Sequence, residues 1–116
     1  MKNVLLLLLM FLLLSCTGKK QNENPLSKRE TVTVSLPSIV CDKCVKTIQK
    51  AIFRVEGVKD VNIDLSKKTA EVEFVPFQTN LQAIEEAITE AGYDANNRKR
   101  NPEAYEKLDQ CCKIDG

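Results

Sequence analysis

Two cysteines three positions apart, Cys41 and Cys44, carry the clearest chemistry in this 116-residue chain. They follow an alternating apolar run and precede a helical pattern, so we expect Cys41 in a loop and Cys44 at or near a helix N-terminus. The helix dipole and the free backbone N–H groups there favour thiolate over thiol. Two neighbouring thiolates can bind one soft metal ion or close a disulfide, and these outcomes lead to different functions.

The composition excludes several other kinds of site. The chain has no histidine, which rules out an imidazole base, a Cys-His nucleophile pair and a histidine metal ligand. Lys plus Arg number 17 and Asp plus Glu number 16, so the chain has no large positive electrostatic field that would indicate nucleic acid as a partner. Sulfur therefore dominates the chemistry, through five cysteines: Cys16, Cys41, Cys44, Cys111 and Cys112.

The N-terminal segment accounts for one of these cysteines. A short positive start precedes an unbroken apolar run over residues 4–14, which is short for a bilayer span and has the length of a signal-peptide core. The run ends in Leu13-Leu14-Ser15-Cys16, which resembles the bacterial lipobox. This resemblance implies that residues 1–15 are removed and that Cys16 is lipidated. An ordinary signal peptide with an incidental cysteine, or a retained membrane anchor, is the alternative.

Residues 16–29 are polar and lysine-rich and are expected to form a flexible tether between a lipid and a folded domain. The domain then begins with a half-buried strand over residues 31–36, where apolar and polar side chains alternate. Two further alternating runs, over 58–65 and 70–74, are joined by a short polar turn and predict a hairpin. A last strand is expected at residues 93–95. It is expected to be weak, because the polar residues that follow do not continue an apolar alternation.

Two amphipathic helices are predicted between these strands. Apolar residues recur at helical spacing over 45–55 and again over 81–91, and Gly57 and Gly92 are available to end each helix in a left-handed conformation. The order strand, helix, strand, strand, helix, weak strand predicts an α+β fold. It is the βαββαβ pattern of a ferredoxin-like sandwich, with two helices on one face of an antiparallel sheet.

The composition shifts near Asn96, and another helical pattern follows. Pro102 opens it, with Asn101 as the expected N-cap, and it runs to Cys111-Cys112. We therefore expect a domain over residues 30–97 and a helical tail over residues 98–116.

At this point the sequence resembles a known family, the heavy-metal-associated domain of copper chaperones, the periplasmic mercury-binding protein and metal-pumping ATPases. The resemblance rests on the Cys41-Asp42-Lys43-Cys44 loop between the first strand and helix, on Glu56-Gly57-Val58, and on Ala91-Gly92-Tyr93-Asp94-Ala95. It implies that Cys41 and Cys44 bind the metal ion. It further implies that Tyr93 packs beside the metal and screens it without ligating it.

Two thiolates on a loop suit a soft ion that accepts two ligands, such as Cu(I) or Hg(II), whereas zinc prefers four. We expect Cu(I) first, because Tyr93 resembles the bacterial copper chaperones, and Hg(II) second. The expected function is binding and transfer, or sequestration, of that ion without catalysis. The implied partner is a metal-transporting membrane protein such as a P-type ATPase. The protein is expected to be a monomer, extracytoplasmic and lipid-anchored to a bacterial membrane.

Two questions stay open at the level of sequence. Cys111 and Cys112 can supply extra thiolates to the Cys41–Cys44 site, bind a metal of their own or form a vicinal disulfide. Cys41 and Cys44 can also serve a thiol–disulfide oxidoreductase or form a structural disulfide. A thioredoxin-like enzyme would need a longer parallel sheet and usually an aromatic residue before the first cysteine, and the sequence offers neither.

Overall fold

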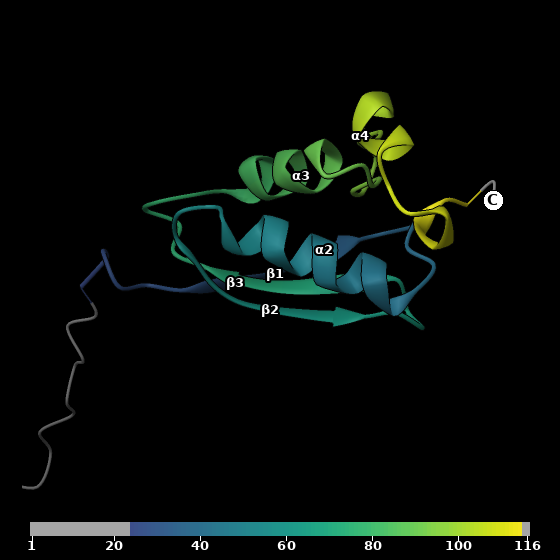
Figure 1. The fold of residues 1–116 in the computed structure, drawn as a ribbon. Helices are drawn as coiled ribbons and strands as arrows, with labels where there is room; N and C mark the ends of the chain where they lie inside the picture. Colours follow the sequence, from purple (N-terminus) through teal and green to yellow (C-terminus); the bar gives the residue numbers. More distant parts are fainter. Residues whose placement is uncertain (1–23, 115–116) are drawn as a thin grey trace, which may run out of the picture.

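A three-stranded antiparallel sheet with two helices on one side forms the body of the protein, as the computed structural model shows (Figure 1). The structure describes residues 24–114. The predicted signal peptide, the lipidated Cys16 and most of the tether lie outside these residues. In chain order the elements are β1 (Glu30–Ser35), α2 (Asp42–Phe53), β2 (Val58–Asp64), β3 (Thr69–Phe74), α3 (Leu81–Glu90), α4 (Pro102–Glu106) and the 3₁₀ turn η1 (Gln110–Cys112). None of the helices in this part of the chain is long and apolar enough to cross a membrane.

The sheet has the strand order β1-β3-β2, with both pairs antiparallel. Its register places Val34 opposite Ala70 and Val61 opposite Val72, and all four side chains are buried. The period-two alternation of the sequence therefore directs one face of each strand towards the helices. The predicted first strand and the predicted hairpin are confirmed.

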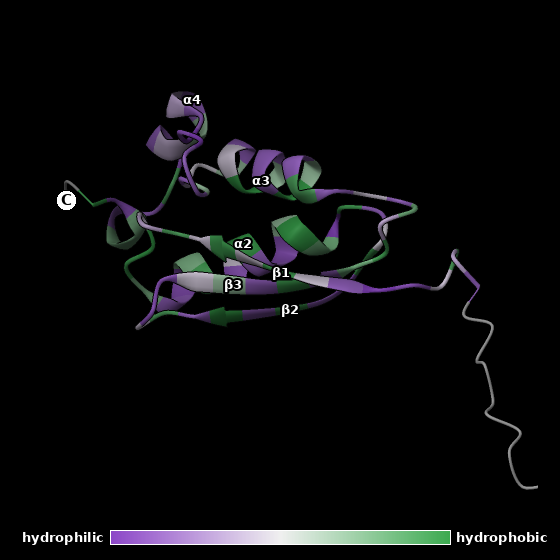
Figure 2. Cartoon of the chain, turned by 180° about the vertical axis from the view of Figure 1, so that it is seen from behind, coloured by the Kyte–Doolittle hydropathy of each residue, from purple (hydrophilic) through white to green (hydrophobic). Residues whose placement is uncertain are grey.

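The helices bury the stripes that their spacing predicts. Ile48 and Ile52 of α2 and Ile84 and Ile88 of α3 are fully buried. In Figure 2 the hydrophobic part of α3 lies on its side towards the sheet. Burial of each such side chain contributes roughly 1.5–3 kcal/mol before chain entropy is subtracted, so these four residues form the centre of a small core.

The weak last strand predicted at residues 93–95 does not form. The chain meets the free edge of β1 at one residue only, where the Asn96 N–H donates to the Ser35 carbonyl and the Ser35 N–H donates to Asn96 Oδ1, each at 2.8 Å. Ala95 and Arg98 then exchange backbone hydrogen bonds around Asn96, whose φ of +52° is left-handed. Asparagine tolerates this conformation, and the polar residues that follow offer no apolar side chain to the sheet, so the chain turns back.

The tail packs against the end of α3. Asn101 caps α4 by accepting hydrogen bonds from the N–H groups of Glu103 and Ala104, and its own N–H donates to the Thr89 carbonyl at 2.9 Å. The predicted N-cap and the helix start at Pro102 are confirmed. The single helix predicted to reach the two tail cysteines is wrong. The helix α4 ends at Glu106, and the separate turn η1 holds the cysteines, so the tail bends back towards α2 (Figure 1).

Gly92 fixes the place where the tail meets the domain. Its φ is +102°, and a Cβ added there would lie 3.0 Å from the backbone of Ala104 and of Tyr105. Gly57 is a matched control because its φ is +96° and an added Cβ would meet the Gln78 side chain instead. Each Gly→Ala change is expected to destabilise the fold by about 1–3 kcal/mol in urea unfolding, because the left-handed backbone is strained. Only Gly92→Ala is expected to displace α4 and speed alkylation of the buried Cys112. Equal protection of Cys112 in both variants would contradict this packing.

Candidate metal centre

Cys41 and Cys44 sit at the N-terminus of α2, where the sequence places them. Cys41 is the N-cap with an extended backbone, and its carbonyl accepts from the N–H groups of Cys44 and Val45 at 3.1 and 3.3 Å. The two Sγ atoms lie 3.2 Å apart. Cys44 is buried and Cys41 is half-buried, so one thiol faces the core and the other faces the surface.

The loop before Cys41 is anchored to the segment that follows α3. Ser38 is buried, and its Oγ accepts a hydrogen bond from the Asp94 N–H at 2.9 Å. Ile39 is fully buried in the core. These two contacts hold the chain on the N-terminal side of Cys41, and they were not found from the sequence because Ser38 and Asp94 are far apart in the chain.

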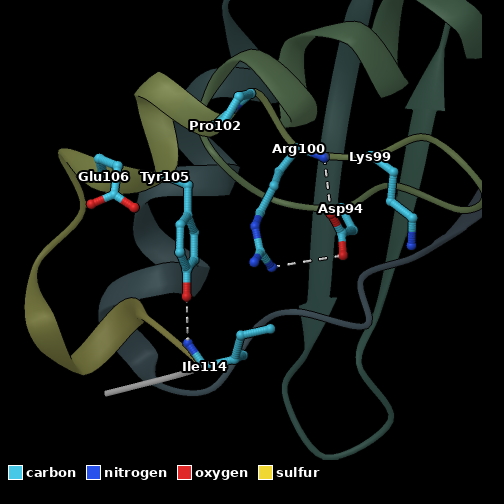
Figure 3. A pocket seen from close by; sticks show the side chains of 7 residues that line it. All are labelled: Asp94, Lys99, Arg100, Pro102, Tyr105, Glu106 and Ile114. Carbon is cyan, nitrogen blue, oxygen red and sulfur yellow. Dashed lines mark hydrogen bonds and ion pairs between the residues drawn. The ribbon is translucent and has the colours of Figure 1, made fainter.

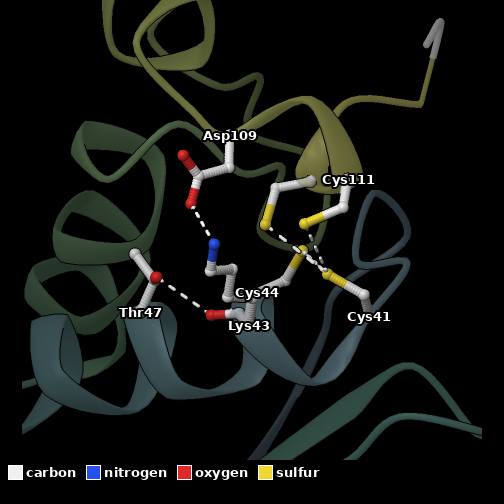
Figure 4. Close-up of polar contacts among 7 residues, drawn as sticks. Cys41, Lys43, Cys44, Thr47, Asp109 and Cys111 are labelled. Atoms are coloured by element: carbon white, nitrogen blue, oxygen red, sulfur yellow. Dashed lines mark hydrogen bonds and ion pairs between the residues drawn. The ribbon is translucent and has the colours of Figure 1, made fainter.

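The tail brings its two cysteines to the same place (Figure 4). Cys41 Sγ lies 3.7 Å from Cys111 Sγ and 3.5 Å from Cys112 Sγ. The Sγ atoms of Cys41, Cys111 and Cys112 all lie within 4.8 Å of one another. All four thiols are free in the structure. We call Cys41, Cys44, Cys111 and Cys112 the sulfur cluster, and Cys41 contacts each of its other members.

An ion pair joins α2 to the chain just before η1. Lys43 Nζ lies 2.7 Å from Asp109 Oδ2, and both side chains are about two-thirds exposed (64% and 63%). The pair raises the pKa of Lys43 and lowers the pKa of Asp109. An exposed pair adds little to stability. Its position nevertheless favours the arrangement in which η1 lies against α2, and it keeps a cation beside the sulfur cluster.

Tyr93 lies beside the cluster, where the resemblance puts it. Its side chain is 1% exposed, and its hydroxyl has no hydrogen-bond partner among the described residues. Burial raises the pKa of Tyr93 strongly, and the neighbouring sulfurs of Cys112 and Cys44 raise it further. The hydroxyl therefore stays protonated, and a thiolate sulfur that formed beside it would give it an acceptor.

The cysteines differ in acidity. Burial acts to raise the pKa of Cys41, but the backbone of Cys44 and the thiols of Cys44, Cys112 and Cys111 stabilise its thiolate and lower the pKa to about 7. Burial raises the pKa of Cys112 well above its usual range, and Cys44 adds to that effect. Cys41 therefore ionises more readily than an ordinary cysteine, and Cys112 stays protonated at neutral pH.

A pocket of about 610 Å³ under the tail contains no sulfur (Figure 3). Arg100 stacks on the Tyr105 ring at 3.8 Å and pairs with Asp94, and the Tyr105 hydroxyl accepts from the Ile114 N–H at 3.0 Å. Three of its lining residues, Asp94, Arg100 and Tyr105, are thus linked to one another. These contacts hold the chain on both sides of η1, and they give the pocket a structural role.

Comparison with known proteins identifies relatives of the domain. The sequence profile described as the heavy-metal-associated domain matches residues 31–94. The mercuric transport protein periplasmic component of Serratia marcescens is 39% identical over 70 residues, which cover 60% of this chain and 77% of that protein. The match to the profile ends before Cys111 and Cys112, so the tail cysteines lie beyond it.

Solved structures of proteins that bind heavy metals resemble this fold. The crystal structure of oxidized MerP from Ralstonia metallidurans CH34 is 36% identical with a TM-score of 0.58, over 60% of this chain and 96% of that one. A copper binding domain from HMA7, a P-type ATPase, is 28% identical with a TM-score of 0.57, over 60% and 92%. The predicted α+β, ferredoxin-like fold with an antiparallel sheet and two helices is confirmed.

The acidity of Cys41 can be measured by alkylation. Because the thiolate is the nucleophile, the rate at Cys41 is expected to rise with pH around a midpoint near 7 and then level off. An ordinary cysteine, with a pKa of about 8.5, would still be gaining reactivity at that point. Rates for each cysteine follow from iodoacetamide labelling and peptide mass spectrometry. A Cys41 midpoint at or above that of an unfolded control would contradict the stabilisation of its thiolate by the cluster.

Proposed function

This chain belongs to the heavy-metal-associated domain family, and on that premise we propose that Cys41 and Cys44 bind one soft metal ion and pass it on. Heavy-metal binding through cysteines is a binding activity, so the protein is not an enzyme. The observation that carries the proposal is the pair of sulfurs 3.2 Å apart at the N-terminus of α2. The oxidoreductase alternative has no support from the family.

We infer Hg(II) as the preferred cargo, ahead of Cu(I). The expectation of copper rested on Tyr93 alone. Similarity over the whole domain favours mercury, because a mercuric transport protein is 39% identical and oxidized MerP is 36% identical, against 28% for the copper binding domain of HMA7. Both ions are soft and accept two thiolates, so the chemistry of the pair admits either.

The exposure of the two thiols supports a transfer mechanism. Cys44 is buried and can retain the ion, whereas Cys41 is half-buried and open to a partner. A thiol of the partner would add to the ion from the side of Cys41, giving an intermediate with three sulfurs, before Cys41 or Cys44 leaves. The ion then moves without being released to water.

The proposed partner is a metal-transporting membrane protein. Support comes from the names of two relatives, one a periplasmic component of mercuric transport and the other part of a P-type ATPase. We also propose that the protein works outside the cytoplasm, tethered to a bacterial membrane by a lipid on Cys16. That anchor rests on the sequence of residues 1–16, which hold the apolar run and the lipobox-like ending.

Metal binding by the pair alone can be tested with the other three cysteines replaced, as Cys16→Ser, Cys111→Ser and Cys112→Ala. This protein, reduced and anaerobic, is expected to bind one Hg(II) and to prefer it to Cu(I) in competition with a small dithiol. A further Cys44→Ser change is expected to lower Hg(II) affinity by at least about 100-fold, since one of two ligands is lost. Thr47→Ala, one turn further along α2, is the matched control. Unchanged affinity after Cys44→Ser would exclude the pair as the site.

The anchor has a separate test. In bacterial cells fed a radiolabelled or clickable fatty acid, the protein is expected to carry the label and to sediment with membranes. Cys16→Ser is expected to remove the label and to release the protein from the membrane fraction, whereas Cys111→Ser should change neither. A label that survives Cys16→Ser would rule out lipidation at that residue.

A further inference from the structure

Resting on the proposed function, we propose that the tail forms a second metal site that shares Cys41 with the first. In this site Cys41, Cys111 and Cys112 hold the ion with three thiolates. With the tail against α2, the ion passes from the first site to the second. Cys111 and Cys112 bind it as thiolates and lose their protons to solvent, and Cys44 leaves as a thiolate that takes up a proton. The site would take soft ions that accept three sulfurs, of which Hg(II) is one.

The sulfur positions suit three-coordination. With a metal–sulfur distance of about 2.3 Å, the three sulfurs around a planar trigonal ion lie about 4 Å apart. Cys41 Sγ lies 3.7 Å from Cys111 Sγ and 3.5 Å from Cys112 Sγ, and the three atoms all lie within 4.8 Å of one another. A linear ion needs its two sulfurs about 4.6 Å apart. Cys41 and Cys44, at 3.2 Å, must separate to hold a linear ion.

The packing of the tail holds these sulfurs in place. Cys112 is 3% exposed and packs in the core, and Tyr105 is 8% exposed. The backbone of α4 lies directly against Gly92, and the Tyr105 hydroxyl accepts from the Ile114 N–H beyond η1. Because this packing already orders the chain, metal binding does not have to offset the entropy cost of ordering a loose segment.

Cys111 is not needed for that packing. It is exposed and lies outside the core, yet its Sγ lies 3.7 Å from Cys41 Sγ (Figure 4). A tail that served only to cover the end of α3 would need no thiol at this position. The ammonium of Lys43, which pairs with Asp109, also lies near Cys111 and Cys112 and would interact favourably with the net negative charge of one Hg(II) with three thiolates.

Tyr93 gives an independent indication that a ligand belongs here. A buried hydroxyl without a hydrogen-bond partner is uncommon, because leaving it unpaired costs free energy. Its neighbours are the sulfurs of Cys44 and Cys112. Of these two, Cys112 is a ligand of the proposed site. It would bind the ion as a thiolate, which is a better acceptor than a thiol, and so would give the Tyr93 hydroxyl a partner.

The test counts sulfurs around one equivalent of Hg(II) bound to the reduced chain, with Cys16→Ser in every sample so that only the sulfur cluster can bind the ion. X-ray absorption at the mercury edge is expected to give three sulfurs for the wild type and two for Cys111→Ser. Affinity, from competition with a small dithiol, is expected to fall at least about tenfold in Cys111→Ser. Gln110→Ser, in the same turn, is the matched control and should keep three sulfurs. Because Cys111 and Gln110 are exposed, both variants are expected to fold.

Each outcome separates the inference from the proposed function. Two sulfurs in the wild type, with unchanged affinity in Cys111→Ser, would overturn the tail site while leaving the Cys41–Cys44 pair intact. Three sulfurs retained in Cys44→Ala would support the shared site, because Cys44 is not one of its three ligands. Failure of the pair alone to bind Hg(II), measured with Cys16→Ser, Cys111→Ser and Cys112→Ala, would instead count against the proposed function.

Discussion

Cys41 occupies the N-cap of α2, and its sulfur lies within 3.7 Å of each of the other three thiols in the sulfur cluster. This position determines which way the Cys41 sulfur faces, because the extended backbone of an N-cap turns the side chain away from the helix. Cys44, inside the first turn, points into the core. The same helix start therefore provides one reactive sulfur at the surface and one buried sulfur behind it, and the low pKa of Cys41 follows from this arrangement.

The segment from Tyr93 to Asn96 links the three parts that surround the cluster. The Tyr93 hydroxyl lies beside the sulfurs, the Asp94 N–H holds Ser38, and Asn96 pairs with Ser35 at the edge of β1. Asp94 Oδ1 also accepts from the N–H of Arg100 at the start of the tail. A regular last strand would have continued along β1. By turning back at Asn96 instead, the chain returns towards α3, and the tail that follows reaches the sulfur cluster.

Periodicity made most of the domain predictable. Apolar and polar residues alternate along residues 31–36 and 58–74, and apolar residues recur at helical spacing around Ile48 and Ile84. These are local signals, and the residues they predict to be apolar-facing lie in the core of the structure. The contacts of the tail are not local: 70 positions separate Cys41 from Cys111, and no pattern in either segment encodes their meeting. The choice between copper and mercury was equally out of reach, because two thiolates suit both ions and a single tyrosine is weak evidence beside similarity over the whole domain.

The two cysteine pairs are built alike, and this bears on how a tightly held ion can still leave. Each pair has one sulfur towards solvent, Cys41 and Cys111, and one towards the core, Cys44 and Cys112. Under the proposed function, the buried sulfurs would retain the ion and the outer sulfurs would be the ones that a partner's thiol displaces. The two thiolates supplied by the tail would raise affinity, but they would also occupy the position that the partner needs. Release would then require η1 to move away from Cys41. The Lys43–Asp109 ion pair is exposed and would resist this movement little, so the burial of Cys112 and Tyr105 would determine how readily the tail moves.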